Sequence, residues 1–238
     1  MLIFLDFETT GLEPSDKIVA VGMIVQDEEN FTCRYELVNE QKKIPPSASA
    51  IHHITNEMIV GKPKFRESEA YKEILSLNSH ANTLISHNAS FELALLEREG
   101  ILWQGEVIDT LRVSRHLMDD LEGYSLQLLR YELKLYKEES KALLACEKGQ
   151  TMQPHHALCD ALLVKLLYNY LLELSSHAKL CELSHAEVLL KRLEFGKYSG
   201  RFIEEILSID PGYLRWMAAN ITDMSDDLRY TLRYYLGD

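Results

Sequence analysis

The chain reads FLDFETTGL over residues 4–12, near its amino terminus. The apolar run 2–7 predicts a buried β-strand, and Gly11 is a turn signal at its end. Asp6 and Glu8 are two residues apart, so both side chains project from one face of this strand. Two unit charges about 4 Å apart repel by roughly 4 kcal/mol at an effective dielectric constant near 20. In this apolar setting the pair predicts a cation site, with an exposed acidic strand face as the alternative.

Around this strand the pattern predicts a mixed α/β sheet. Residues 17–26 and 31–38 read as two further strands, which would form an antiparallel meander with the first. From residue 83 on, short strands over 83–86 and 107–109 alternate with helical patterns over 89–99 and 111–118. Alternation of this kind indicates helices that flank a sheet, here of five strands with the meander at one edge.

The second half of the chain is predicted to be mainly helical. A long apolar helix is expected over 156–174 after a loop over 149–154, and a further helical segment over 184–193. The last forty residues carry aromatic side chains at helical spacing. We therefore expect two units, a larger domain over 1–178 and a small helical unit over 179–238.

Composition excludes several classes of protein. The 238 residues hold 25 Lys and Arg against 37 Asp and Glu, a net charge of −12 that disfavours a passive nucleic-acid coat or a membrane-surface binder. No 18-residue apolar stretch or signal peptide is evident, so a cytoplasmic protein with no membrane partner is expected. The cysteines lack C-x-x-C spacing, which predicts reduced thiols and no zinc site; they are Cys33, Cys146, Cys159 and Cys181.

Two more acidic residues stand at predicted helix starts. Glu92 follows the sequence His87-Asn88-Ala-Ser-Phe91, and Asp160 follows the pair His155-His156. His156 would share a helical face with Asp160, whereas His155 reaches it only from the preceding loop. The residues alone do not choose between the two histidines.

Together these motifs resemble the three-motif signature of the DEDDh branch of the DnaQ-like 3′-to-5′ exonucleases, which have an RNase H-like fold. The motifs are residues 4–12, His87-Asn88-x-x-Phe91 and His155-x₄-Asp160, and the segments 51–55 and 108–111 are similar to landmarks between them. The resemblance covers residues 1–175.

The resemblance implies phosphodiester hydrolysis with two Mg²⁺ or Mn²⁺ ions. It implies that Asp6 bridges both ions, that Glu8 and Asp160 hold the ion that activates water, and that His155 is the general base. The residues that it implies hold the 3′ end are Thr9, Thr10, Gly11, Leu12, His87, Asn88 and Phe91; Leu12 would be a wedge beside the terminal base, and Phe91 is equally a candidate for the core.

One position departs from the family pattern. Glu92 stands where the family has Asp, and its side chain is longer by one carbon–carbon bond, about 1.5 Å. Because Mg²⁺ demands near-ideal octahedral geometry, we expect activity that is weakened or that favours Mn²⁺.

The carboxy-terminal residues carry a second resemblance, to the small terminal module of exonuclease X-type proteins. It rests on residues 195–202 and 210–216, in which Asp210 and Pro211 predict a helix start. Basic and aromatic residues alternate here and are candidate nucleic-acid contacts, with core packing as the alternative; they are Lys197, Tyr198, Arg201, Tyr213, Arg215 and Trp216.

The sequence therefore predicts a 3′-to-5′ exonuclease that releases nucleoside 5′-monophosphates from DNA, with single-stranded 3′ ends favoured and a replication or repair partner. An RNA-trimming or oligoribonuclease-like enzyme would use the same catalytic residues. A third hypothesis is a catalytically weakened nucleic-acid-binding or proofreading subunit, in which Glu92 has ended turnover.

Overall fold

The computed structural model describes residues 1–28, 30–118, 121–146 and 152–237. In these residues five strands form one mixed sheet in the order β3-β2-β1-β4-β5. β1 (Leu2–Thr9) pairs antiparallel with β2 (Ile18–Asp27), and β2 pairs antiparallel with β3 (Asn30–Leu37). β4 (Thr83–Ser86) and β5 (Glu106–Asp109) continue the sheet in parallel. The predicted mixed sheet, with the meander at one edge and β1 in its centre, is confirmed.

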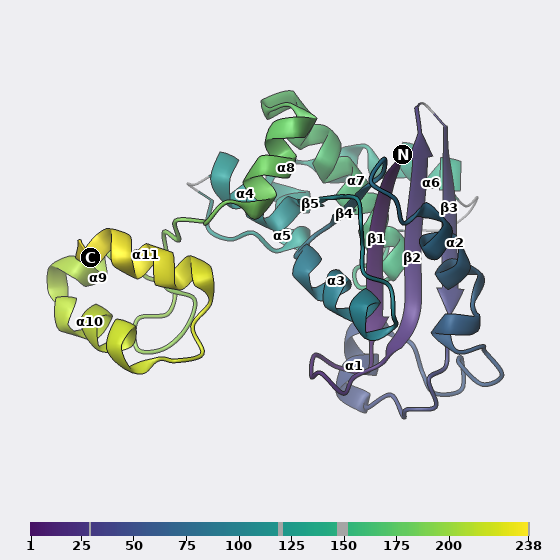
Figure 1. The fold of residues 1–238 in the computed structure, drawn as a ribbon, viewed down its shortest axis with the longest axis horizontal. Coiled ribbons are helices and arrows are strands. Elements are labelled where there is room, and N and C mark those ends of the chain that lie inside the picture. The colour runs from purple at the N-terminus through teal and green to yellow at the C-terminus, as the bar shows by residue number, and fades with distance from the viewer. Residues whose placement is uncertain (29, 119–120, 147–151, 238) are drawn as a thin grey trace.

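Alternation along β1 separates the two faces of the sheet. Phe4 packs into a core with α7 (Ala157–Leu174), on the face to which Asp6 and Glu8 also project. Ile3 and Leu5 pack into a second core with α2 (Glu69–Leu77) and α3 (Ala89–Arg98) on the opposite face. The expectation that the two carboxylates share one face therefore follows from strand geometry, and that face is the one covered by α7 (Figure 1).

Gly22 allows the amino terminus of α7 to lie directly on the sheet. Gly22 is paired with Asp6 across β1 and β2. A Cβ atom at this position would lie 2.0 Å from the Ala157 carbonyl carbon and 2.2 Å from the Leu158 nitrogen. Only glycine permits so close an approach between strand and helix backbones. This contact brings the first turn of α7 over the carboxylates of β1.

Shorter helices complete the larger domain. They are α1 (Pro46–His52), η1 (Phe65–Glu67), α4 (Thr110–Leu117), α5 (Leu126–Glu132), η2 (Leu135–Lys137), α6 (Glu139–Cys146) and α8 (His177–His185). The segment 126–132 carried no prediction; Ser125 caps this helix by accepting a hydrogen bond from the Leu128 N–H. The loop predicted over 149–154 lies in part outside the described residues. No helix in the described ranges is long and apolar enough to cross a membrane.

Three helices form a second unit, drawn in yellow-green and yellow in Figure 1: α9 (Ile203–Ile209), α10 (Pro211–Asn220) and α11 (Asp226–Leu236). They enclose a separate apolar core that includes Val188 and Leu193. The boundary predicted between residues 178 and 179 falls inside α8, a helix that packs against β5 and α4. We propose that the second unit begins after α8, at residue 186.

The helical segment predicted over 184–193 is wrong beyond the end of α8 at His185. Residues 187–190 form no helix, and Arg192 forms a β-bridge with Phe202. Side chains of α11 accept the backbone donors of this segment: the Val188 N–H donates to Asp227, and the Leu190 N–H donates to Thr231. Apolar residues at 188 and 190 suit an alternating extended segment as well as a helix, and the partners from α11 decide between them.

The prediction of four reduced thiols is also wrong. Cys33 on β3 and Cys146 at the end of α6 form a disulfide, with their Cα atoms 5.4 Å apart. The two cysteines are 113 residues apart in the chain, so no local spacing indicates the pairing. Cys159 and Cys181 are free and buried, as expected.

We predict that Gly22→Ala destabilises the protein by about 1–3 kcal/mol, because the added methyl group forces α7 away from β2. Chemical denaturation measures the change in the free energy of unfolding. Gly212→Ala is the matched control, since its Cβ would meet its nearest neighbour at 3.6 Å. Equal effects of the two substitutions would contradict the account of Gly22.

Candidate active site

Three carboxylates converge where β1 meets α7. Asp6 and Glu8 come from β1, and Asp160 comes from the first turn of α7. One oxygen atom from each lies within 4.8 Å of the other two. Glu8 and Asp160 are buried, and Asp6 is partly buried. The structure thus brings together three of the four predicted acidic ligands.

Burial raises the pKa of all three carboxyl groups. The pKa of Glu8 rises to about 8, first through burial and then through the charge of Asp160. Burial raises the pKa of Asp160 to about 7, against the lowering effect of a hydrogen bond from the His155 backbone. The pKa of Asp6 lies well above its ordinary value, through burial and then through the charges of Asp160, Glu8 and Glu92. Three charged carboxylates are therefore unstable here without a cation.

Glu92 lies beside this cluster in the first turn of α3. It is buried at 3% exposure, and its Oε2 atom has no hydrogen-bond partner among the described residues. Its pKa is raised by burial, with smaller contributions from Asp109 and Glu8. A buried carboxylate oxygen without a donor needs either a proton or a metal ion. The donor set, four carboxylates in one buried region, fits a hard divalent cation, which prefers oxygen ligands.

The two neighbouring histidines occupy different environments. His155 is exposed and has a left-handed backbone with φ of 57°. His156 is half-buried, and its ring stacks on Tyr35 with the ring centroids 4.2 Å apart. The side chain of His156 therefore packs against β3. His155 is the histidine whose ring is available to solvent.

The loop after β1 is held rigidly from within. Thr9 donates its hydroxyl to the Gly11 carbonyl at 2.6 Å, and Thr10 donates to Asp16 at 2.6 Å. The buried ring of His52 contacts the Thr9 carbonyl through Nε2 at 3.2 Å. Because His52 Nδ1 accepts the Ile54 N–H, Nε2 carries the proton and donates.

Leu12 follows this braced segment and is 84% exposed. A large apolar side chain presented to solvent on a fixed loop suits contact with a ligand. The role of wedge beside the terminal base, which the sequence resemblance implies for Leu12, stays a prediction.

In the second motif, His87 and Phe91 make contacts inside the protein and present little of their surface to a substrate. Both ring nitrogens of His87 have partners inside the protein, Thr110 Oγ1 at 3.0 Å and the Tyr124 carbonyl at 2.8 Å. Burial lowers the pKa of His87 to about 4, so the ring is neutral. Phe91 is half-buried against the core with α2 and α3. His87 thus has a structural role, in which its ring joins Thr110 to the Tyr124 backbone.

Asp109 is a structural residue whose role the sequence did not reveal. Its carboxylate accepts the backbone N–H groups of Asn88 and Ala89 at the start of α3, and those of Leu111 and Arg112 at the start of α4. One side chain therefore caps the helix that carries Glu92 and a second helix beside it. Asp109 lies in a landmark segment, which was the available signal.

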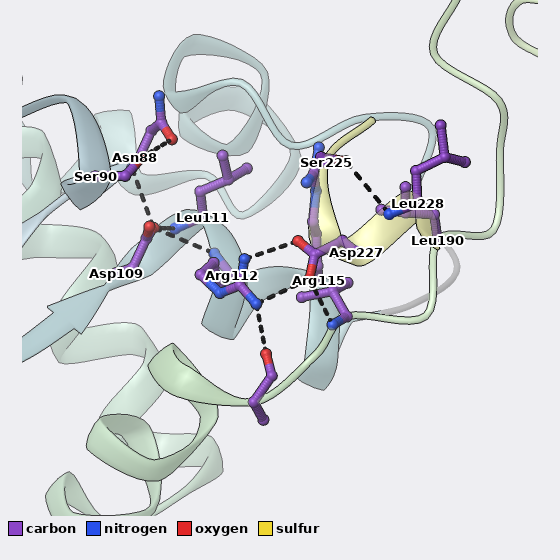
Figure 2. Close-up of polar contacts among 12 residues, drawn as sticks. Asn88, Ser90, Asp109, Leu111, Arg112, Arg115, Leu190, Ser225, Asp227 and Leu228 are labelled. Atoms are coloured by element: carbon purple, nitrogen blue, oxygen red, sulfur yellow. Dashed lines mark hydrogen bonds and ion pairs between the residues drawn. The ribbon is translucent and has the colours of Figure 1, made fainter. Parts of the chain in front are cut away.

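From α4 the contacts continue to the second unit (Figure 2). Arg112 forms a two-pronged ion pair with Asp227 at 2.7 and 2.9 Å, and also donates to the Ala186 carbonyl. Asp227 in turn accepts the Val188 N–H. Bidentate arginine–carboxylate geometry fixes orientation as well as distance. The second unit is thus fastened to the helix that follows β5.

The candidate nucleic-acid contacts of this unit fall into two groups. Lys197 and Tyr198 both bind the Asp210 carboxylate, at 3.0 and 2.9 Å, and Tyr213 is half-buried against the unit's core. Asp210 also caps α10, which confirms the predicted helix start. The exposed group comprises Arg201, Arg215 and Trp216, the last at 52% exposure.

The comparisons with known proteins agree with this geometry. The model of the Exonuclease family matches residues 3–168. The chain belongs to this exonuclease family. Enzymes of the family depend on divalent metal ions. A second model, the exodeoxyribonuclease X-like C-terminal domain, matches residues 193–222.

Two relatives and two solved structures illustrate the similarity. Exodeoxyribonuclease 10 of Escherichia coli K12 is 29% identical over 99% of both chains. The DNA polymerase III subunit epsilon of Treponema pallidum is 31% identical, over 64% of this chain and 76% of that protein. Exonuclease X in complex with 5′ overhanging duplex DNA has a TM-score of 0.60 and 24% identity, over 77% of this chain and 99% of that one. E. coli exonuclease I with a dA16 oligonucleotide has a TM-score of 0.54 and 17% identity, over 76% and 42%. The structural likenesses confirm the RNase H-like fold.

The raised pKa values predict that stability of the metal-free protein falls as pH rises from 6 to 8. In this range the folded carboxyl groups retain protons that the unfolded chain has lost, so the unfolded state gains as pH increases. Thermal melts in EDTA measure the slope. Glu8→Gln should flatten it, whereas Glu132→Gln, which removes an exposed charge, should leave it unchanged. A slope that is identical in all three proteins would contradict the assignment.

Proposed function

We propose that this exonuclease removes nucleoside 5′-monophosphates from the 3′ ends of DNA. The observation that supports it most strongly is the convergence of Asp6, Glu8 and Asp160, which bring oxygen atoms to within 4.8 Å of one another in a largely buried setting. The choice of DNA rests on the relatives, which include an exodeoxyribonuclease similar over the full chain, and on the match of the carboxy-terminal module.

We propose Mg²⁺ or Mn²⁺ as the cofactor, with two ions held by Asp6, Glu8, Glu92 and Asp160. When bound there, such ions would supply a nucleophilic water and stabilise charge on the attacking and leaving oxygens. The raised pKa values of the cluster and the unpartnered Oε2 of Glu92 support this donor set. Four carboxylates bring four negative charges that two such ions balance.

His155 is the proposed general base. His155 is exposed, and its backbone N–H donates to the Asp160 carboxylate, which ties the residue to the cluster. A ring nitrogen of His155 accepts the proton of the attacking water, a role that a neutral imidazole can fill as a general base. The braced backbone of Thr9 and Thr10 holds the terminal nucleotide, and Leu12 packs against its base. Gly11, Asn88 and Phe91 are further candidates for this end of the substrate.

In the second unit we propose that Arg201, Arg215 and Trp216 bind the single strand that leads to the site. These side chains are exposed, and Arg201 and Arg215 form no ion pair within the described residues. Lys197, Tyr198 and Tyr213 support α10 and its cap instead. A replication or repair partner is proposed from the likeness to a polymerase subunit, and a cytoplasmic location from the bacterial relatives that act on DNA.

Glu92 supports a second hypothesis about the function of this chain. If the longer side chain prevents binding of the second ion, the chain is a weakened nucleic-acid-binding subunit rather than an efficient enzyme. The observation behind this second hypothesis is that Glu92 is not among the three carboxylates whose oxygen atoms lie within 4.8 Å of one another. RNA trimming would use the same cluster, and substrate comparison separates it from DNA hydrolysis.

Asp6→Ala should abolish exonuclease activity, lowering kcat/KM by about 10³-fold or more, because a metal ligand shared by the cluster is lost. The assay uses 3′-end-labelled single-stranded DNA and RNA oligonucleotides in Mg²⁺ and in Mn²⁺. Asp223→Ala removes an exposed carboxylate and is the control. Wild-type protein that is as inert as Asp6→Ala on every substrate would contradict the proposed activity, and faster cleavage of RNA would favour the trimming enzyme.

Glu92→Asp should preserve or raise the rate in Mg²⁺ and reduce any preference for Mn²⁺. The shorter side chain restores the family's carboxylate, and the ratio of rates in the two metals measures the effect. A loss of more than about tenfold, or roughly 1.4 kcal/mol of barrier, would mean that the site has adapted to glutamate.

Trp216→Ala should weaken binding of single-stranded DNA about tenfold, the effect of losing one base-stacking contact. Fluorescence anisotropy in EDTA measures affinity without cleavage. Tyr234→Ala removes an equally exposed aromatic residue from α11 and should have no effect. Affinity within twofold of wild type in both variants would place the DNA elsewhere.

A further inference from the structure

A buried ion pair lies close to the carboxylate cluster, on α5 and α6, which carry none of the residues of the three motifs. Arg130 on α5 and Glu139 at the start of α6 are 9% and 6% exposed. The guanidinium donates to both carboxylate oxygens, through Nε to Oε1 and through Nη2 to Oε2, the latter at 2.7 Å. This two-pronged geometry holds the guanidinium plane in one orientation.

The third nitrogen of Arg130 connects the ion pair to Gln127, one turn earlier on the same helix. Nη1 donates to Gln127 Oε1 at 3.2 Å, and Gln127 Nε2 donates to Asp160 Oδ1 at 3.0 Å. A guanidinium has donors only, so it fixes which end of the amide faces it. The oxygen of Gln127 points to Arg130, and its NH₂ group points to Asp160.

The ion pair is a costly way to stabilise a fold. Desolvation of two buried charges offsets most of their attraction, and a well-packed apolar pair is often at least as stabilising. What an apolar pair cannot do is orient the amide of Gln127. Arg130 lies three residues after Gln127, whose side chain hydrogen-bonds Asp160 of the carboxylate cluster, and this location gives the ion pair a function beyond packing.

We propose that Gln127, oriented by the Arg130–Glu139 ion pair, is the positioning residue that holds the Asp160 carboxylate in the geometry required for a divalent cation. The inference rests on the proposed role of Asp160 as a metal ligand and adds the group that controls it. Groups hydrogen-bonded to metal ligands typically change metal affinity or activity by about 10–100-fold when they are removed.

Gln127→Leu tests this proposal, because leucine keeps the bulk of the side chain and removes both hydrogen bonds. We expect Mn²⁺ affinity, measured by electron paramagnetic resonance on the full chain, to fall about 10–100-fold. We also expect kcat to fall while KM for a DNA oligonucleotide stays within twofold, since Gln127 acts through its hydrogen bond to Asp160. Glu132→Leu, an exposed position on the same helix, is the matched control and should bind Mn²⁺ as wild type does.

The double variant Arg130→Met with Glu139→Leu separates positioning from folding. It removes the ion pair, keeps an apolar contact and leaves Gln127 in place. A melting temperature close to that of wild type together with Mn²⁺ affinity as low as in Gln127→Leu supports the proposal. Mn²⁺ affinity within twofold of wild type in either folded variant overturns it. Wild-type protein that binds no Mn²⁺ would instead overturn the proposed function of the cluster itself.

Discussion

The close approach of α7 to β2 at Gly22 is the constraint on which the site depends. Asp6 on β1 is paired with Gly22 on the neighbouring strand β2. The backbone of α7 occupies the space that a side chain at residue 22 would need. Asp160 follows Ala157 by three residues, so the same contact that fixes the helix also fixes the third carboxylate of the cluster. Local strand geometry supplies two acids, and one glycine allows a distant segment to supply the third.

This convergence has an electrostatic cost that explains the chemistry of the site. Burial and mutual repulsion raise the pKa values of the cluster, and Glu92 adds a buried oxygen without a partner. Two divalent ions would change the formal charge from −12 to −8, so the loaded protein is still acidic. With screening over about 8 Å at physiological salt, long-range attraction to nucleic acid is weak. Binding therefore has to rely on local contacts, for which Leu12 and the exposed group of the second unit are the proposed candidates.

Sequence patterns predicted what depends on short-range geometry. Asp6 and Glu8 share a face because strand side chains alternate, and the antiparallel meander follows from apolar runs and the turns between them. The environments of His155 and His156 differ through a loop conformation and a ring stack on Tyr35, which spacing does not encode. The Cys33–Cys146 disulfide joins two positions that are 113 residues apart in the chain. The extended course of residues 187–190 depends on Asp227 and Thr231 in the same way.

The second unit is tied to the catalytic domain through polar contacts that begin at the site. Asp109 caps both α3, which carries Glu92, and α4, whose Arg112 pairs with Asp227. The central claim, however, concerns the carboxylates themselves. A crystal structure with Mn²⁺, located by its anomalous scattering, tests it most directly. The account predicts two peaks about 3.5–4 Å apart with Asp6 bound to both; no peak at the cluster, or peaks that Asp6 and Asp160 do not touch, would contradict it.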